Sequence, residues 1–464
     1  TLNPKPFYYI GQYVFVTWLS RITQISLVDI SKWLVPLAAA FLIPICLAFA
    51  YHRFSPKAGA ALVLILLPLS LFVGSTPQGF SLVLGITAVI CAIGVTRKDI
   101  GLRAPIWIGL WSVAVHPLSG LPLLGISISV VLAGQSKKWL QILAWPAAIL
   151  SGISVPVAFY MASNFTSGLK IDWSLQQILH LSNWINPILN LIPWLSNKYV
   201  LWPAWASLIG LSLPLLGLLL SILSFYLVKQ ERKLIGVLIL SAFILIFSAG
   251  FLENVSDFAF LIQYERGDYA LRLVQIAVFI LLLGGASAMG FVVERIRKAP
   301  AIVSLLAILM IGGIGAANAH NTLPRHDAAQ ASRGWSTGQA DVDAVHWIDR
   351  TASGREYTVL SNQSVSAAAI REFGFKRYAD DVFFYPIPTG GPLYATYLRM
   401  TYEDPSVDTV REAAKLGKSD LVFVVINDYW WKASELNEQI SLLADQEWSI
   451  KDGKIMIYVF DFKE

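Results

Sequence analysis

The distribution of Lys and Arg between apolar runs constrains this chain most strongly. Between residues 32 and 319 about ten apolar runs alternate with short polar gaps, and the cations fall in every second gap. The basic gaps contain Arg53, Arg97, Lys137, Arg232 and Arg297. Because cytoplasmic loops of membrane proteins carry an excess of Lys and Arg, we expect these gaps to be cytoplasmic. The other gaps and the polar C-terminal part are then extracytoplasmic.

The composition is typical of a polytopic membrane protein. Of the 464 residues, 56% are hydrophobic and 14% are charged, whereas about a quarter of a soluble domain is charged. Residues 321–464 hold 15 Lys and Arg against 21 Asp and Glu, and residues 1–320 hold 20 against 9. The basic pI of 9.0 therefore reflects membrane topology, and we expect no nucleic acid partner because no basic stretch is interleaved with aromatic residues.

The apolar runs predict a helical membrane domain over residues 1–320. A membrane-spanning helix needs about 20 predominantly apolar residues. The predicted helices are Trp33–Tyr51, Ala58–Val73, Gly79–Val95, Ala104–Val115, Leu118–Gly134, Trp139–Ala162, Leu201–Val228, Leu234–Leu252, Ala270–Val293 and Ala301–Ala319. Ala104–Val115 is short, and with its neighbour across His116-Pro117 it fits a broken or re-entrant hairpin.

Two segments are predicted to lie along the outer membrane surface. Residues 8–24 are apolar but interrupted by polar side chains, and a crossing there would move Arg53 outside. A juxtamembrane helix preserves the alternation of basic gaps. Residues 164–200 form a long loop, expected to contain amphipathic helices that serve as an anchor or face substrate. Its tryptophans are Trp173, Trp184 and Trp194.

The pattern changes to a soluble α/β type near residue 340. Residues 321–340 are polar and predict a linker, and residues 341–464 predict one small extracytoplasmic α/β domain. The predicted helices are Val342–Thr351, Ser366–Phe373, Val407–Leu416 and Ser434–Ala444. The predicted strands are Tyr357–Leu360, Leu421–Ile426, Trp448–Ile450 and Ile455–Phe460. Asp452-Gly453 is typical of a hairpin turn between the last two strands.

The sequence contains no P-loop, nucleophile elbow, dinucleotide-binding glycine motif or metal-binding Cys and His cluster. No cofactor is therefore identified, and a divalent metal is left as an alternative. Cys46 and Cys91 both lie in apolar runs and are expected to be free thiols. Asp380-Asp381 has the form of a carboxylate pair, but its loop position predicts a solvated turn.

Polar residues at membrane depth or at its outer rim are the candidates for function, because they are costly unless satisfied or used. The densest group contains Glu265, Arg266, Asp268 and Arg272. Arg272 is expected one turn inside a helix, where its guanidinium suits phosphate oxygens. The alternative is that Glu265 or Asp268 neutralises it at helical spacing.

Weaker candidates lie elsewhere on the predicted outer side. His116 precedes Pro117 at a hairpin, where it either binds substrate or forms a hydrogen bond at a helix end. Lys5, Arg21 and Asp29 surround the predicted juxtamembrane helix. Arg21 there either contacts membrane lipid or faces an anionic lipid carrier.

Four short segments have a recognisable order along the chain. They are Asn3–Tyr13, Ser75–Gly79, His116–Gly120, and Tyr264–Tyr269 followed by Arg272. With the trailing outer domain, they resemble prokaryotic GT-C type membrane glycosyltransferases. The resemblance covers most of the chain by layout and loose motifs, so a GT-C-like fold of the helical domain is expected.

The resemblance implies an integral plasma-membrane enzyme that transfers a sugar from a polyprenyl-phosphate carrier to an extracytoplasmic acceptor. It implies inverting displacement, in which a carboxylate deprotonates the acceptor and cations stabilise the departing phosphate. Arg272 and Arg266 are expected at the phosphate, with weaker contributions from His116 and Lys5. The family's catalytic carboxylates occupy a loop that would precede Thr1, so the catalytic base is not assigned.

Two other functions fit the same sequence. One is a non-catalytic membrane scaffold that binds protein partner subunits of a larger complex. The other is a transporter of a lipid-linked glycan, although no internal repeat or pair of half-helices is visible. An apolar helix and a loop with paired carboxylates upstream of Thr1 would favour the enzyme.

Overall fold

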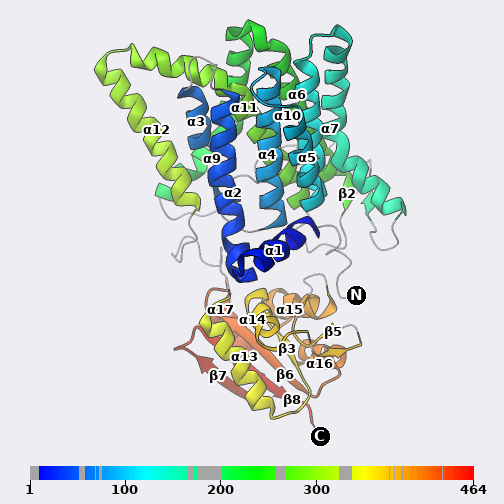
Figure 1. Ribbon diagram of the computed structural model, residues 1–464. Helices are drawn as coiled ribbons and strands as arrows, with labels where there is room; N and C mark the ends of the chain where they lie inside the picture. Colours follow the sequence, from blue (N-terminus) through cyan, green and yellow to red (C-terminus); the bar gives the residue numbers. More distant parts are fainter. Residues whose placement is uncertain are drawn as a thin grey trace. The chain divides into compact units, whose positions relative to one another are not determined.

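Figure 1 shows the computed structural model of the chain. The structure describes residues 10–51, 58–67, 69–72, 76–165, 171–174, 201–257, 267–322, 337–375, 377–380, 382–387, 391–430 and 432–463. These residues divide into two compact units, one containing residues 10–322 and the other residues 337–463.

The first unit is a bundle of helices (Figure 1). Its helices are α1 (Ile10–Thr23), α2 (Leu27–Ala50), α3 (Ala58–Leu66), η2 (Leu69–Phe72), α4 (Pro77–Thr96), α5 (Arg103–Val115), α6 (Pro117–Ala133), α7 (Lys138–Phe165), α9 (Leu201–Leu227), η4 (Lys229–Glu231), α10 (Arg232–Val255), α11 (Asp268–Arg297) and α12 (Ala301–Thr322). Two short strands, β1 (Asp172–Trp173) and β2 (Ser256–Asp257), pair antiparallel.

Five of the described helices are long and apolar enough to cross a membrane. They are Leu27–Ala50, Pro77–Thr96, Lys138–Asn164, Lys229–Val255 and Asp268–Arg297. This is compatible with an integral membrane protein. About ten apolar runs were predicted to form helices, and only these five of the described helices reach the length needed to span a membrane. The prediction of one helix over Ala58–Val73 is wrong, since α3 ends at Leu66. The separate helix η2 begins at Leu69, and Pro68 lies outside the described residues.

The core of the bundle forms around α4 and α11, whose most apolar windows are 89% and 83% buried. Small residues allow close approach of the helices there. Gly284 and Gly285 of α11 face Ser221 and Leu220 of α9, where an added Cβ would clash. The Ser221 hydroxyl donates to the Leu281 carbonyl at 2.6 Å, so this polar group is satisfied inside the apolar core.

One end of the bundle brings together several connections predicted to be basic gaps. Arg97, after α4, donates to the Ala50 carbonyl at the end of α2 (2.7 Å). It also pairs with Glu231, which precedes α10. Lys233 donates to Gln141 near the start of α7. This arrangement fits the alternation in the sequence, while the side of the membrane stays a prediction.

Helix α1 lies across the opposite end of the bundle (Figure 1). Gly11 packs directly against the backbone of Ala114 in α5. Phe15 packs on the rings of Phe80 and Trp111, with centroids 6.0 and 4.9 Å away, and these two rings also contact each other. Trp18, on the outward face, is 56% exposed. The separate helix predicted within residues 8–24 is therefore present, and its position at a membrane surface stays a prediction.

The second unit has three layers built on a four-stranded sheet in the order β3-β6-β8-β7. Its strands are β3 (Tyr357–Leu360), β6 (Leu421–Asn427), β7 (Gln446–Ile450) and β8 (Ile455–Asp461), with β4 (Tyr378–Ala379) and β5 (Val382–Phe383) in a separate hairpin. Its helices are α13 (Gln339–Ala352), α14 (Gln363–Phe373), α15 (Pro392–Tyr402), α16 (Val407–Gly417) and α17 (Ala433–Ser441).

Alternating side chains of the strands support the two helical layers. β3 and β6 are parallel, and the other neighbours are antiparallel. Val359 and Phe423 face α13 and α14 in one core. Thr358, which points to the other face, meets Gly417 of α16 so closely that no Cβ fits. Tyr458 on that face donates to the Asn437 carbonyl of α17.

The four strands and four helices predicted in this unit are confirmed, with small shifts at their ends. The Asp452-Gly453 turn joins β7 to β8, and both residues have positive φ. Asp380 lies in an exposed turn and pairs with Lys418 at 2.8 Å, which confirms the solvated turn for this residue. Asp381 lies outside the described residues. Helix α15 and the hairpin of β4 and β5 were not predicted.

Candidate functional site

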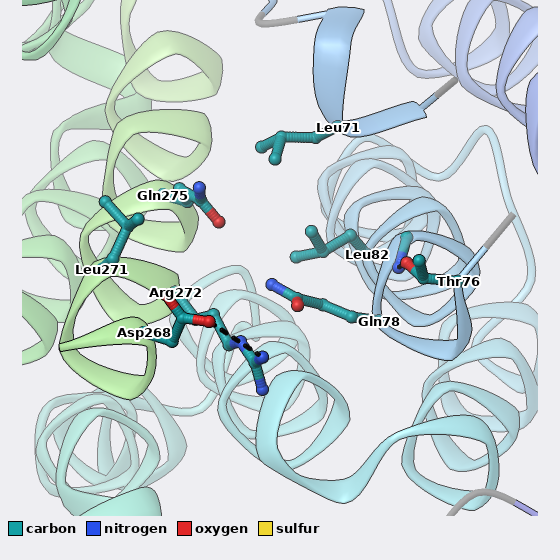
Figure 2. Close-up of a pocket in the computed structure, with 9 residues that line it drawn as sticks. Leu71, Thr76, Gln78, Leu82, Asp268, Leu271, Arg272 and Gln275 are labelled. Carbon is teal, nitrogen blue, oxygen red and sulfur yellow. Dashed lines mark hydrogen bonds and ion pairs between the residues drawn. The ribbon is translucent and has the colours of Figure 1, made fainter. Parts of the chain in front are cut away.

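A cavity of about 250 Å³ lies where α4 and α11 begin (Figure 2). It combines apolar walls with a few polar side chains, as ligand sites do. The residues that line it are Leu71, Thr76, Gln78, Gly79, Leu82, Asp268, Leu271, Arg272 and Gln275. Three segments far apart in the sequence, around η2, α4 and α11, therefore form one site.

Two helix N-termini face this cavity. At α4, the Thr76 hydroxyl accepts the Gly79 amide (3.0 Å) and Pro77 begins the helix, which is a common start pattern. At α11, the N-cap Gly267 supplies no side-chain cap. The first-turn N–H groups and the helix dipole make a helix N-terminus favourable for an anion. The first turn of α11 therefore favours an anion beside the cavity, whereas at α4 Pro77 has no N–H and the Gly79 N–H is already bonded to Thr76.

Arg272 adds a full positive charge to the cavity. Its guanidinium lies 3.9 Å from the Asp268 carboxylate, the limit of an ion pair, and the two side chains are 25% and 49% exposed. It also lies 5.2 Å from the centroid of the Tyr269 ring. Figure 2 shows Arg272 and Asp268 together on the α11 side of the cavity. A pair this long and this exposed is weak, so a closer anion would displace Asp268.

Two glutamines reach into the same space. Figure 2 shows the Gln78 side chain extending from α4 toward α11, and the Gln275 amide directed into the cavity. The Gln275 Oε1 atom is buried and has no hydrogen-bond partner within the described part of the chain. A ligand hydroxyl is the kind of donor that would satisfy it. Gln275 was not predicted, although it follows Arg272 at helical spacing, and Gln78 was predicted only as part of the segment Ser75–Gly79.

The chain matches no protein-family model, no curated protein and no solved structure.

His116 lies close to this site without lining the cavity. It caps α6, where its Nδ1 accepts the Ser119 amide at 3.3 Å. The side chain is buried, and it lies within electrostatic range of Arg272. The structure thus places Arg272, Asp268 and His116 in one region, with His116 in the helix-end role that the sequence analysis gave as its alternative.

The remaining predicted residues either lie outside the described residues or do not line the cavity. Lys5, Glu265 and Arg266 lie outside the described residues, as do Trp184 and Trp194. Trp173 is described; its indole donates to Ser163 (3.4 Å). Arg21 is exposed on α1, and Asp29 accepts a hydrogen bond from Ser26 at the start of α2.

The two cysteines are free, with their sulfur atoms 3.7 Å apart between α2 and α4. Among the described residues, no group of three or more His, Cys, Asp or Glu side chains is placed to hold a metal ion.

Proposed function

We propose that this protein is a membrane glycosyltransferase that takes its sugar from a polyprenyl-phosphate carrier, and that the cavity receives the carrier's phosphate end. The observation that carries the proposal is Arg272 at the N-terminus of α11 inside a partly apolar cavity. Apolar walls, fixed backbone dipoles and a guanidinium are together suited to a phosphate joined to a hydrocarbon chain.

The energetics of Arg272 favour such a ligand. A cation on a membrane helix costs about 2.5–3.5 kcal/mol at the bilayer centre and less near the rim, so it is retained where an anion compensates it. The long contact with Asp268 compensates it only weakly. A phosphate can accept two parallel hydrogen bonds from one guanidinium, which is a stronger interaction.

The size of the cavity restricts which part of the carrier enters. Pockets for drug-sized ligands measure about 300–1,000 Å³, and this cavity of about 250 Å³ is slightly smaller. It therefore suits the phosphate and its nearest neighbours. Leu71, Leu82 and Leu271 would contact the first isoprenoid carbons, and the rest of the chain would lie in lipid.

The proposed reaction uses the cavity to stabilise the leaving group. The acceptor oxygen forms a bond to the anomeric carbon, and the bond from that carbon to the carrier phosphate breaks. The phosphate leaves with the bonding electron pair, and a carboxylate takes the acceptor proton. Arg272 and the first turn of α11 would offset the negative charge that develops on the phosphate. The catalytic base is not assigned.

The test is carrier binding by the full chain in nanodiscs, measured with undecaprenyl phosphate by native mass spectrometry. Arg272→Gln should weaken binding at least tenfold, and Arg272→Lys should restore part of it because it keeps the charge without the planar fork. Arg297→Gln removes an exposed Arg at the C-terminal end of the same helix, α11, and serves as the control. Unchanged binding in Arg272→Gln, with the unfolding temperature preserved, would refute the proposal.

A second measurement separates catalysis from mere binding. Membranes containing radiolabelled polyprenyl-phosphate sugars should release the label to acceptor or water with wild type, and more slowly with Arg272→Gln. Carrier binding without any release of sugar would instead favour the scaffold.

A further inference from the structure

The C-terminal unit has a topological switch point at the carboxyl ends of β3 and β6. These strands are parallel neighbours. After β3 the chain continues into α14 on the α13 face, and after β6 it continues into α17 on the opposite face. In open α/β sheets, ligands bind in the crevice that such a divergence creates beyond the carboxyl ends of the strands.

Three polar side chains form a hydrogen-bonded network at the carboxyl ends of these strands, namely Asn362, Asn427 and Tyr429. Asn362 follows β3, and its Nδ2 donates to Asn427 Oδ1 (2.9 Å) and to the Tyr429 hydroxyl (2.8 Å). Asn362 Oδ1 accepts from the first amides of α14. Asn362 and Asn427 are buried, so this network holds the Tyr429-Trp430 segment at the strand ends. The side-chain amides of Asn362 and Asn427 are thereby occupied by protein partners, and Asn427 also donates to Asp341.

An aromatic group of Trp430, Tyr397 and Tyr402 lies beside this network. The Trp430 ring makes edge-on contacts with Tyr397 (5.7 Å between centroids) and Tyr402 (5.8 Å) of α15. Tyr402 is 44% exposed and Trp430 is half-buried. Within the described part of the chain, Trp430 Nε1 is buried without a hydrogen-bond partner. Because an unsatisfied buried donor is costly, a ligand that reaches this N–H on binding would be favoured.

We propose that this aromatic group binds a carbohydrate. Rings of Tyr402 and Trp430 offer apolar surface for the C–H face of a pyranose, and the indole N–H offers a donor for a sugar hydroxyl or ring oxygen. Asp428 is exposed next in sequence to Tyr429 and can accept from a further hydroxyl. That the bound sugar belongs to the acceptor glycan rests on the proposed function. Sugar binding by this aromatic group does not depend on it.

The experiment is saturation-transfer NMR on the full chain in nanodiscs, with methyl glucoside, N-acetylglucosamine, mannobiose, cellobiose and chitobiose as probes. At least one of these sugars should show saturation transfer, and its titration should give a Kd in the millimolar range or tighter. Tyr402→Ala removes the exposed ring, and Trp430→Phe keeps a ring but removes the N–H. Each should weaken Kd about three- to tenfold, the effect of one lost hydrogen bond or ring contact.

Trp448→Ala is the matched control, because Trp448 is 52% exposed on β7 and stacks on Trp347 away from the strand ends. It should leave Kd unchanged. Absence of transfer from all five sugars, or equal losses in Trp448→Ala and Tyr402→Ala, would overturn the inference. Arg272→Gln separates it from the proposed function, since that variant should lose carrier binding and keep sugar binding.

Discussion

Arg97 and Glu231 form a largely buried ion pair that joins the end of α4 to the start of α10. Their closest N–O distance is 2.7 Å, and their side chains are 12% and 16% exposed. Arg97 also lies over the Tyr51 ring, with its Cζ 4.1 Å from the centroid, and Ser287 of α11 donates to Glu231. Four helical segments distant in sequence are therefore connected through two side chains.

Removal of one partner should destabilise the bundle. Breaking a buried pair costs roughly 3–5 kcal/mol, because the remaining charge is left uncompensated. Glu231→Gln should therefore lower the unfolding temperature in detergent micelles by several degrees. Arg97→Met combined with Glu231→Met should recover much of the loss. Lys98→Gln changes the exposed neighbour and is the control. A Glu231→Gln variant as stable as wild type would contradict the importance of this pair.

The contact of α1 with α5 depends on Gly11. A Cβ at this position would lie 2.6 Å from the Ala114 carbonyl oxygen, and backbone cannot yield cheaply. Gly11→Ala should loosen α1 and accelerate tryptic cleavage after the exposed Arg21 several-fold. Gly312→Ala on α12 is the matched control, because a Cβ there meets no atom within 4 Å. Equal cleavage rates in both variants would show that α1 does not depend on this contact.

Membrane orientation can be tested with single cysteines in a chain whose Cys46 and Cys91 are replaced by alanine. Lys98→Cys and Arg297→Cys lie in exposed basic connections, and Leu442 is 86% exposed in the C-terminal unit. In intact cells, a membrane-impermeant maleimide should label Leu442→Cys only, because basic loops stay inside. Labelling of Lys98→Cys before permeabilisation would reverse the predicted topology.

Asp461 gives the C-terminal unit a defined acid sensitivity. Hydrogen bonds from Arg355, at 2.6 and 2.7 Å, lower the pKa of Asp461 to about 2. Because its folded pKa is depressed, this carboxylate contributes its full stability above the unfolded value near 3.8 and loses it as the pH falls through about 2. Arg355→Gln should therefore lower the urea midpoint slightly above pH 4 and have little effect near pH 2.

The fluorine NMR signal of 5-fluorotryptophan at Trp448 would report this unfolding in the full chain. Arg371→Gln, which removes an exposed Arg on α14, is the control. A midpoint difference that grows toward low pH would have the wrong sign for this mechanism.

Most helices and strands were predictable because their signals are local. Long, mainly apolar runs mark α4 and α11, and the strand Tyr357–Leu360 is predicted to the residue. Helix α15 escaped prediction because its Tyr and Thr residues are typical of strands. Its burial at Leu393, Tyr397 and Met400 follows helical spacing only once it packs on the sheet.

The candidate site was predictable in part for the same reason. Arg272 was found because a charge inside an apolar run is conspicuous. Gln275 was missed, and Gln78 was found only within the segment Ser75–Gly79, because neither residue is informative by itself. Their joint position at the cavity depends on α4 and α11 becoming neighbours, which is a contact across almost 200 residues that no local pattern encodes.

Asp341 connects the first helix of the C-terminal unit to the centre of its sheet. It accepts the Gly338 amide at 2.7 Å and the Asn427 amide group at 3.0 Å, and Asn427 ends the central strand β6. Tension applied along the preceding chain would reach β6 through this side chain. A pull from the N-terminal side of this unit would therefore load an inner strand of the sheet as well as α13.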